Sequence, residues 1–67
     1  MVLYTVYMHD ARYSAPNLDL VTAADDARAR ELASQRLDAS PHHLMVEVFE
    51  EDRLVCVVRR EETIADI

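Results

Sequence analysis

The side chains best suited to chemistry in this chain are three histidines and a single cysteine: His9, His42, His43 and Cys56. A structural zinc ion requires four such ligands that converge tetrahedrally. His42 and His43 are adjacent, and neighbouring residues of a strand point to opposite faces of a sheet, so this pair is poorly placed to chelate one ion. If the helix predicted below connects parallel strands, His9 and His42 lie at opposite ends of the sheet. We therefore expect no metal site.

A cysteine nucleophile would need Cys56 and a nearby histidine. Cys56 stands among valines in the segment LVCVV, where a thiol behaves as a small apolar side chain. Ser14, Ser34 and Ser40 lack the sequence pattern of a nucleophile elbow. Because the sequence offers no converging acid, base and nucleophile, we expect no catalytic residue and predict that the protein is not an enzyme.

The lack of glycine and of lysine excludes several kinds of cofactor site. Phosphate loops and dinucleotide-binding turns need glycines, because the backbone must approach a pyrophosphate closely. A Schiff base with pyridoxal phosphate needs a lysine. The acidic run 50–52 lacks the glycine of an EF-hand loop and is better interpreted as the solvated tip of a hairpin. No cofactor is expected.

The charge of the chain argues against nucleic acid as a partner. Its formal net charge is −6, and its seven basic residues are arginines, scattered apart from Arg59 and Arg60. Nucleic-acid binding requires clustered positive charge. No apolar run approaches the ~20 residues that span a bilayer, and the first residues lack the positive region of a signal peptide. With only one cysteine, these features favour a cytoplasmic protein that binds neither membrane nor nucleic acid.

The first third of the chain predicts one strand and one ambiguous segment. Residues 2–8 alternate and are rich in β-branched and aromatic side chains, which predicts a strand with apolar residues on both faces. Residues 9–17 contain turn formers and predict an irregular connection. Residues 18–21 are compatible either with a short strand that pairs with the first or with a continued loop.

A single helix is predicted over residues 22–40. Thr22 is the expected N-cap, with Asp25 three residues later, and Pro41 ends the helix. The apolar stripe is narrow and consists of Ala29, Leu32, Ala33 and Leu37. Such a stripe buries little area, so the core of a chain of 67 residues is marginal without a partner.

Two apolar segments close the chain as a β-hairpin around residues 50–53. A two-residue and a four-residue loop are both compatible with this hairpin, and we prefer the four-residue loop because the tip lacks the Asn-Gly of a tight turn. Either loop pairs Phe49 with Leu54 and Val48 with Val55, and both faces of the hairpin carry apolar side chains. The predicted fold is α+β: a three- or four-stranded antiparallel or mixed sheet with one helix on one face. It forms one domain over residues 1–67, in which 62–67 is a flexible tail.

The second apolar face of this hairpin is the candidate interface. In the predicted register it carries Met45, Glu47, Phe49, Leu54, Cys56 and Val58. Exposed apolar patches usually mark interaction surfaces, so we expect a two-fold homodimer. Alternatively, the first strand or the tail covers this face. The charge of Glu47 would face the partner, pair with Arg59 or Arg60, or block a sheet edge.

The aromatic residues leave two interpretations open. Tyr4, Tyr7, Tyr13 and Phe49 either pack in the core and its rim or line a cleft for a planar ligand. The expected function is therefore a non-enzymatic interaction domain that self-associates. An unidentified protein is the alternative partner. The alternative is an oligomer that binds a small ligand in a pocket between its subunits.

The chain also resembles a group of very short bacterial proteins of unknown function. Their pattern is an aromatic strand, a D-x-x-x-A-D-D-A segment that leads into an alanine-rich helix, V-E-V-aromatic, a turn and R-x-V. The matching residues are Tyr4, Tyr7, Asp19, Ala24, Asp25, Asp26, Ala27, Val46, Glu47, Val48, Phe49, Arg53 and Val55. The resemblance implies a small α+β fold and no particular activity. The group has a glycine turn after its first strand, which this chain lacks, so a tight first hairpin is not expected.

Overall fold

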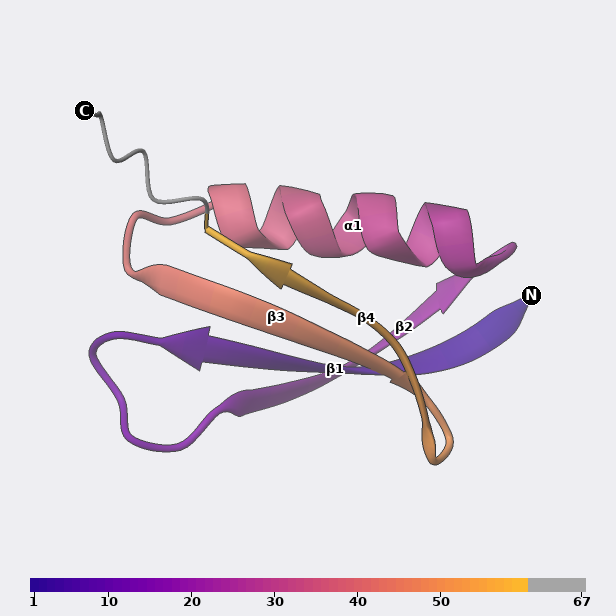
Figure 1. Ribbon diagram of the computed structural model, residues 1–67, viewed down its shortest axis with the longest axis horizontal. Coiled ribbons are helices and arrows are strands. Elements are labelled where there is room, and N and C mark those ends of the chain that lie inside the picture. The colour runs from indigo at the N-terminus through magenta and orange to yellow at the C-terminus, as the bar shows by residue number, and fades with distance from the viewer. Residues whose placement is uncertain (61–67) are drawn as a thin grey trace.

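A four-stranded antiparallel sheet with one helix across a face forms the described part of the molecule, residues 1–60 of a computed structural model (Figure 1). The elements are β1 (Val2–Asp10), β2 (Asn17–Ala23), α1 (Asp26–Asp38), β3 (His43–Glu50) and β4 (Arg53–Arg59). The strand order is β2-β1-β3-β4, so β1 and β3 are the inner strands. The predicted α+β class is confirmed. The predicted tail, 62–67, lies outside the described residues.

The ambiguous segment is a strand, longer than the four residues considered. β2 pairs with β1 over seven residue pairs, from Met8 with Asn17 to Val2 with Ala23. It begins directly after Pro16, a residue tolerated at the start of an edge strand. Residues 11–16 form the connection from β1, which is longer than a tight two-residue turn and agrees with the absence of glycine.

The helix begins three residues later than a Thr22 cap would place it. Thr22 pairs with Leu3 as part of β2, so it is unavailable as an N-cap. Asp25 is the N-cap: its backbone is extended, and its Oδ1 accepts a hydrogen bond of 2.9 Å from the backbone N–H of Arg28. α1 contacts all four strands and packs mainly on β3.

The core lies between α1 and the sheet. From the helix, Ala29, Ala33 and Leu37 are buried, as the predicted stripe requires. The sheet supplies the other buried apolar side chains, Tyr4, Val6, Met8, Ala23, Val46 and Val48. Two alanines and one leucine let the helix approach closely but bury little area, so the core remains small.

The hairpin differs from its prediction in loop length and register. The loop has two residues, Glu51 and Asp52, because Glu50 pairs with Arg53. Such tight turns need a residue with positive φ, a position that glycine usually occupies. Here Glu51 occupies it, with φ 54°. Phe49 pairs with Leu54 as predicted. Beyond that pair an irregularity shifts the register by one, so Val48 pairs with Cys56 and not with Val55.

Candidate functional site

The side of the sheet away from α1 is covered by no segment of residues 1–60 (Figure 1). We call this side the open face. On β1 the even-numbered residues from Tyr4 to Asp10 are buried toward the helix, so the odd-numbered ones lie on the open face. Residues paired across strands share a face. The open face therefore comprises Leu3, Thr5, Tyr7, His9, Leu18, Leu20, Thr22, Met45, Glu47, Phe49, Leu54, Val57 and Arg59.

Large apolar side chains on the open face are strongly exposed. The exposed fractions are 56% for Leu3, 62% for Leu18, 59% for Leu20 and 51% for Leu54. These four leucines come from β1, β2 and β4, so they extend across the width of the sheet. An antiparallel sheet with one solvated face normally carries polar residues there. The open face therefore departs from the composition of an ordinary solvated sheet face.

The middle of the open face holds two aromatic rings. Tyr7 and Phe49, on the inner strands β1 and β3, meet edge to face, with ring centroids 5.7 Å apart and an interplanar angle of 89°. A hollow of about 260 Å³ lies beside them and is lined by Thr5, Tyr7, Phe49, Glu51 and Asp52. Its walls are aromatic on one side and acidic on the other, and it borders the open face.

A polar pair interrupts the apolar surface. His9 Nε2 lies 2.8 Å from Glu47 Oε1, and both side chains are about one-third exposed. The expected pairing of Glu47 with Arg59 or Arg60 is wrong, because its partner is His9. The expected position at a sheet edge is also wrong, because Glu47 lies on the inner strand β3. The pair thus belongs to the open face and does not guard a sheet edge.

The predicted interface residues divide between the two sides of the sheet. Met45, Glu47, Phe49 and Leu54 lie on the open face. Cys56 and Val58 do not, because they pair with the buried residues Val48 and Val46 and pack toward the helix. The irregularity in β4 causes this difference, since a shift of one residue moves side chains to the opposite face.

Several open-face residues were missed at the sequence level. Leu3, Leu18 and Leu20 lie in segments whose sequence alternates. Because the sequence leaves open whether residues 18–21 form a strand, it does not assign Leu18 and Leu20 to a side of the sheet. Tyr7 was weighed only as core or as cleft. The signal that would have found these residues is pairing between β1 and β2, which places Leu20 opposite Thr5 and Leu18 opposite Tyr7.

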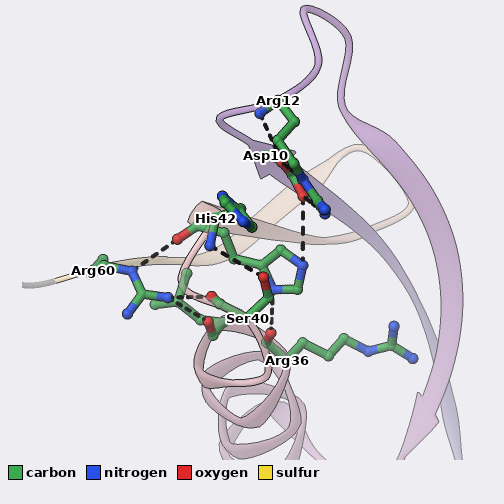
Figure 2. A network of polar contacts seen from close by, with 8 residues as sticks. Asp10, Arg12, Arg36, Ser40, His42 and Arg60 are labelled. Carbon is green, nitrogen blue, oxygen red and sulfur yellow. Dashed lines mark hydrogen bonds and ion pairs between the residues drawn. The ribbon is translucent and has the colours of Figure 1, made fainter.

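A second concentration of charge lies at the end of α1 (Figure 2). Asp10, only 4% exposed, accepts hydrogen bonds from the backbone N–H and the guanidinium of Arg12. These bonds hold the pKa of the Asp10 carboxyl well below its usual range, although burial opposes the shift. The carbonyl of Arg36 can only accept, so His43 Nδ1 donates to it, at 2.7 Å.

Arg60 completes this end of the helix. Its guanidinium donates to the carbonyls of Leu37, Ser40 and His43 at 2.7–2.9 Å (Figure 2). The bond to Leu37 satisfies a carbonyl that a helix leaves without a partner at its C-terminus, and the other two bonds hold the loop that leads into β3. The bonds described above all join groups of the chain itself, so we interpret the network as structural.

The other end of the helix is tied to the sheet by Asp26. The hydroxyl of Tyr4 donates to Asp26 Oδ1 at 2.8 Å, and Arg53 forms an ion pair with the same carboxylate at 3.3 Å. Burial, followed by the hydrogen bond to the carboxylate, raises the pKa of Tyr4 to about 12. The hydrogen bonds from Arg53 and Tyr4 lower the pKa of Asp26. These contacts fix the position of α1 over β1 and β4.

A larger cavity, of about 430 Å³, lies on the helix side between β2 and the end of α1. Its floor is Val6 and Met8, and its rim includes Asp19 and Arg36, which form an ion pair with each other. The ion pair satisfies both charges within the chain. The cavity therefore offers an apolar floor but no charged group aimed at a ligand.

The histidines and the cysteine do not form a metal site. Since β1 and β3 are antiparallel, His9 lies at the same end of the sheet as residues 42–45, contrary to the expectation for parallel strands. His9 points to the open face, whereas Cys56 packs on the helix side. Among residues 1–60 no three histidine, cysteine, aspartate or glutamate side chains are grouped to hold an ion.

The chain matches no protein-family model, no curated protein and no solved structure. None of the helices in the described part of the chain is both long and apolar enough to cross a bilayer. The open face is the surface on which residues 1–60 depart most from an ordinary solvated sheet.

Proposed function

We propose that the chain is a non-enzymatic, cytoplasmic interaction domain that forms a homodimer through its open face. The observation that carries this proposal is the exposure of Leu3, Leu18, Leu20 and Leu54 on one side of the sheet. Burial of apolar surface releases about 25 cal/mol for each Å² removed from water. Exposed patches of this kind are rare on monomers.

The small core supports the same proposal. The helix contributes only Ala29, Ala33 and Leu37 to it. Small domains without disulfides or metals commonly gain their remaining stability from oligomerisation. The alternative in which the first strand folds over the face is wrong, because β1 is an inner strand of the sheet itself.

The test is sedimentation velocity or native mass spectrometry of the full chain over a range of concentrations. A dimer is expected, and Leu20→Asp or Phe49→Asp weakens it at least about tenfold, because an unpaired carboxylate would be buried at the interface. Leu44→Asp is the matched control: Leu44 is 50% exposed and, by alternation with Met45, lies on the helix side. Val58→Asp tests the core and not the interface, since Val58 packs toward α1.

A clean monomer at all concentrations contradicts the homodimer. Equal association of wild type, Leu20→Asp and Phe49→Asp shows that a dimer uses another surface, such as the edge of β2. Either result moves the search for the occupant of the open face to the tail or to a different protein.

A second candidate function is a dimer that holds a small planar ligand between its subunits. The hollow beside Tyr7 and Phe49 favours it, because a second copy packed on the open face would close that hollow. Under native conditions a mass above that of two chains supports this function. A mass equal to two chains, after purification without denaturant, contradicts it.

A further inference from the structure

The outer edge of β2 carries a row of backbone groups, and a side chain of the same strand covers the centre of that row. β2 is an edge strand whose first four residues are exposed. Asp19 Oδ1 accepts a hydrogen bond of 2.9 Å from the backbone N–H of Leu20, and Asp19 Oδ2 forms an ion pair with Arg36 of α1. We propose that this carboxylate blocks the edge of β2 against the addition of β2 from a second copy of the chain.

The hydrogen-bonding pattern of the sheet turns the N–H of Leu20 toward the outer edge. Backbone groups of successive residues point to opposite sides of a strand. The N–H of Arg60 donates to the carbonyl of Leu44, so Leu44 faces β4. Alternation through the paired residues of β3, β1 and β2 then turns Asp19 toward β1 and Leu20 outward. The groups that face the outer edge are those of Leu18, Leu20 and Thr22.

The edge of β2 has no other protection within the strand. Natural edge strands are usually protected by charged side chains, prolines or bulges. Asp19 is the only charged residue of β2, the strand contains no proline, and its register with β1 is regular. The opposite edge strand, β4, has an irregular register with β3 and an arginine at each end. Protection of the β2 edge therefore depends on Asp19.

The segment that matches this edge best is β2 of a second copy. A two-fold axis that passes through Leu20, perpendicular to the sheet, pairs all seven residues of β2 with those of its partner in antiparallel order. Leu20 then lies opposite Leu20 of the partner subunit, and Leu18 lies opposite Thr22 of the partner subunit. The three residues that face outward become the hydrogen-bonded positions, so the two edges are complementary over the whole strand.

Asp19 opposes this pairing in two ways. The N–H of Leu20 has to leave the carboxylate before it can bond to an added strand. On the helix side of the sheet, Asp19 also lies diagonal to Asp19 of the partner subunit, where two carboxylates approach each other and lose water. Because the two-fold axis repeats both contacts, each effect counts twice for one dimer. Alanine at position 19 removes both effects.

The experiment is made in the variant Phe49→Asp, which carries a charge at the centre of the open face, so the proposed dimer does not obscure the result. Addition of Asp19→Ala is expected to strengthen self-association at least about tenfold over Phe49→Asp alone, measured by sedimentation velocity over a range of concentrations. The matched control adds Asp52→Ala, which removes one exposed negative charge from the hairpin turn, away from β2. This control is expected to give no gain.

A further substitution shows whether the gain uses the edge of β2. Because the N–H of Leu18 points outward, Leu18→Pro costs no hydrogen bond to β1 but removes a donor that the added strand needs. Leu18→Pro added to the associating variant should return self-association to the level of Phe49→Asp. Thr22→Pro makes the same test at the other end of the row, and circular dichroism verifies that each variant is folded.

Three outcomes overturn the proposal: no gain with Asp19→Ala, an equal gain with Asp52→Ala, or a gain that persists when proline replaces an outward-facing residue in a folded chain. A wild type that is monomeric at all concentrations contradicts the proposed function but not this inference, because the Asp19→Ala comparison is made without the open-face contact.

Discussion

One buried carboxylate, Asp10, was not singled out by its sequence context. Asp10 ends β1 and is buried, and its charge is maintained by Arg12 two residues later. A spacing of two residues at a strand end allows the same carboxylate to bond both the backbone and the guanidinium of Arg12. The consequence is a group whose protonation is coupled to folding.

Acidification should therefore destabilise the wild type through Asp10. The pKa of this carboxyl is lowered by folding, so the stabilisation is present above the unfolded pKa of about 4 and is lost as the pH falls toward the folded value. Asp10→Asn is expected to be less stable at pH 7 and to show a flatter loss of stability between pH 5 and pH 2. Urea midpoints at one fixed protein concentration measure both effects.

Asp52→Asn is the control for Asp10→Asn, since it also removes one negative charge but lies exposed in the hairpin turn. An identical pH profile for the two variants would contradict the role given to Asp10.

Tyr4 should ionise later than an ordinary tyrosine. Burial and the hydrogen bond to Asp26 raise the pKa of its hydroxyl to about 12, against an ordinary value of 10.0. Absorbance at 295 nm during alkaline titration should show a late step that Tyr4→Phe removes and that Asp26→Asn moves to lower pH. Because the shift is upward, the associated stability is complete below pH 10 and declines as the pH approaches 12. A titration without a late step in the wild type would refute this assignment.

At the scale of elements, strand–helix–hairpin order, the apolar stripe of α1 and the end of the helix before Pro41 were all predictable, because each depends on local periodicity or on proline. The N-cap was not, since Thr22 and Asp25 are both good caps and only the pairing of Thr22 with Leu3 decides between them. The faces of β4 were not predictable either. In LVCVV every position is apolar, so no pattern reveals the shift between Val48 and Phe49.

The two-residue turn offers a test at this scale. Glu51 adopts φ 54°, a conformation that costs a non-glycine residue roughly 1–2 kcal/mol. Glu51→Asn should stabilise the fold by about 0.5–1 kcal/mol, because asparagine tolerates this region. The corresponding rise in melting temperature is about 2–8 °C for a domain of this size.

The matched control for the turn is Asp52→Asn, at the neighbouring position, which does not have a positive φ. Equal stabilisation by Asp52→Asn and Glu51→Asn would attribute the effect to reduced acidity of the tip and not to backbone conformation.

For the whole molecule, the two sides of the sheet carry different parts of the stability. The helix side holds the core, and the open face holds apolar surface that no segment of residues 1–60 buries. In the proposed dimer stability and association are coupled, because a partner that binds only the folded state stabilises it by mass action.

The melting temperature of the wild type should therefore rise with protein concentration. At concentrations about 100-fold above the dissociation constant the added free energy of unfolding is about 2.7 kcal/mol. Leu20→Asp should abolish this dependence, and Leu44→Asp should retain it. Differential scanning calorimetry over a hundredfold concentration range is the measurement, and a concentration-independent melting temperature for wild type would contradict the coupling.

Cys56 packs toward α1, so the rate at which its thiol is labelled can report on local opening of the fold. Burial raises the pKa of this thiol, so little thiolate is present near neutral pH, and its side chain is partly screened by α1. We therefore expect alkylation of Cys56 to be slower than that of an exposed cysteine and to quicken when β4 separates from α1. Since the sequence has one cysteine, the labelling rate of the unmodified protein reports on the contact between β4 and α1 without any engineered probe.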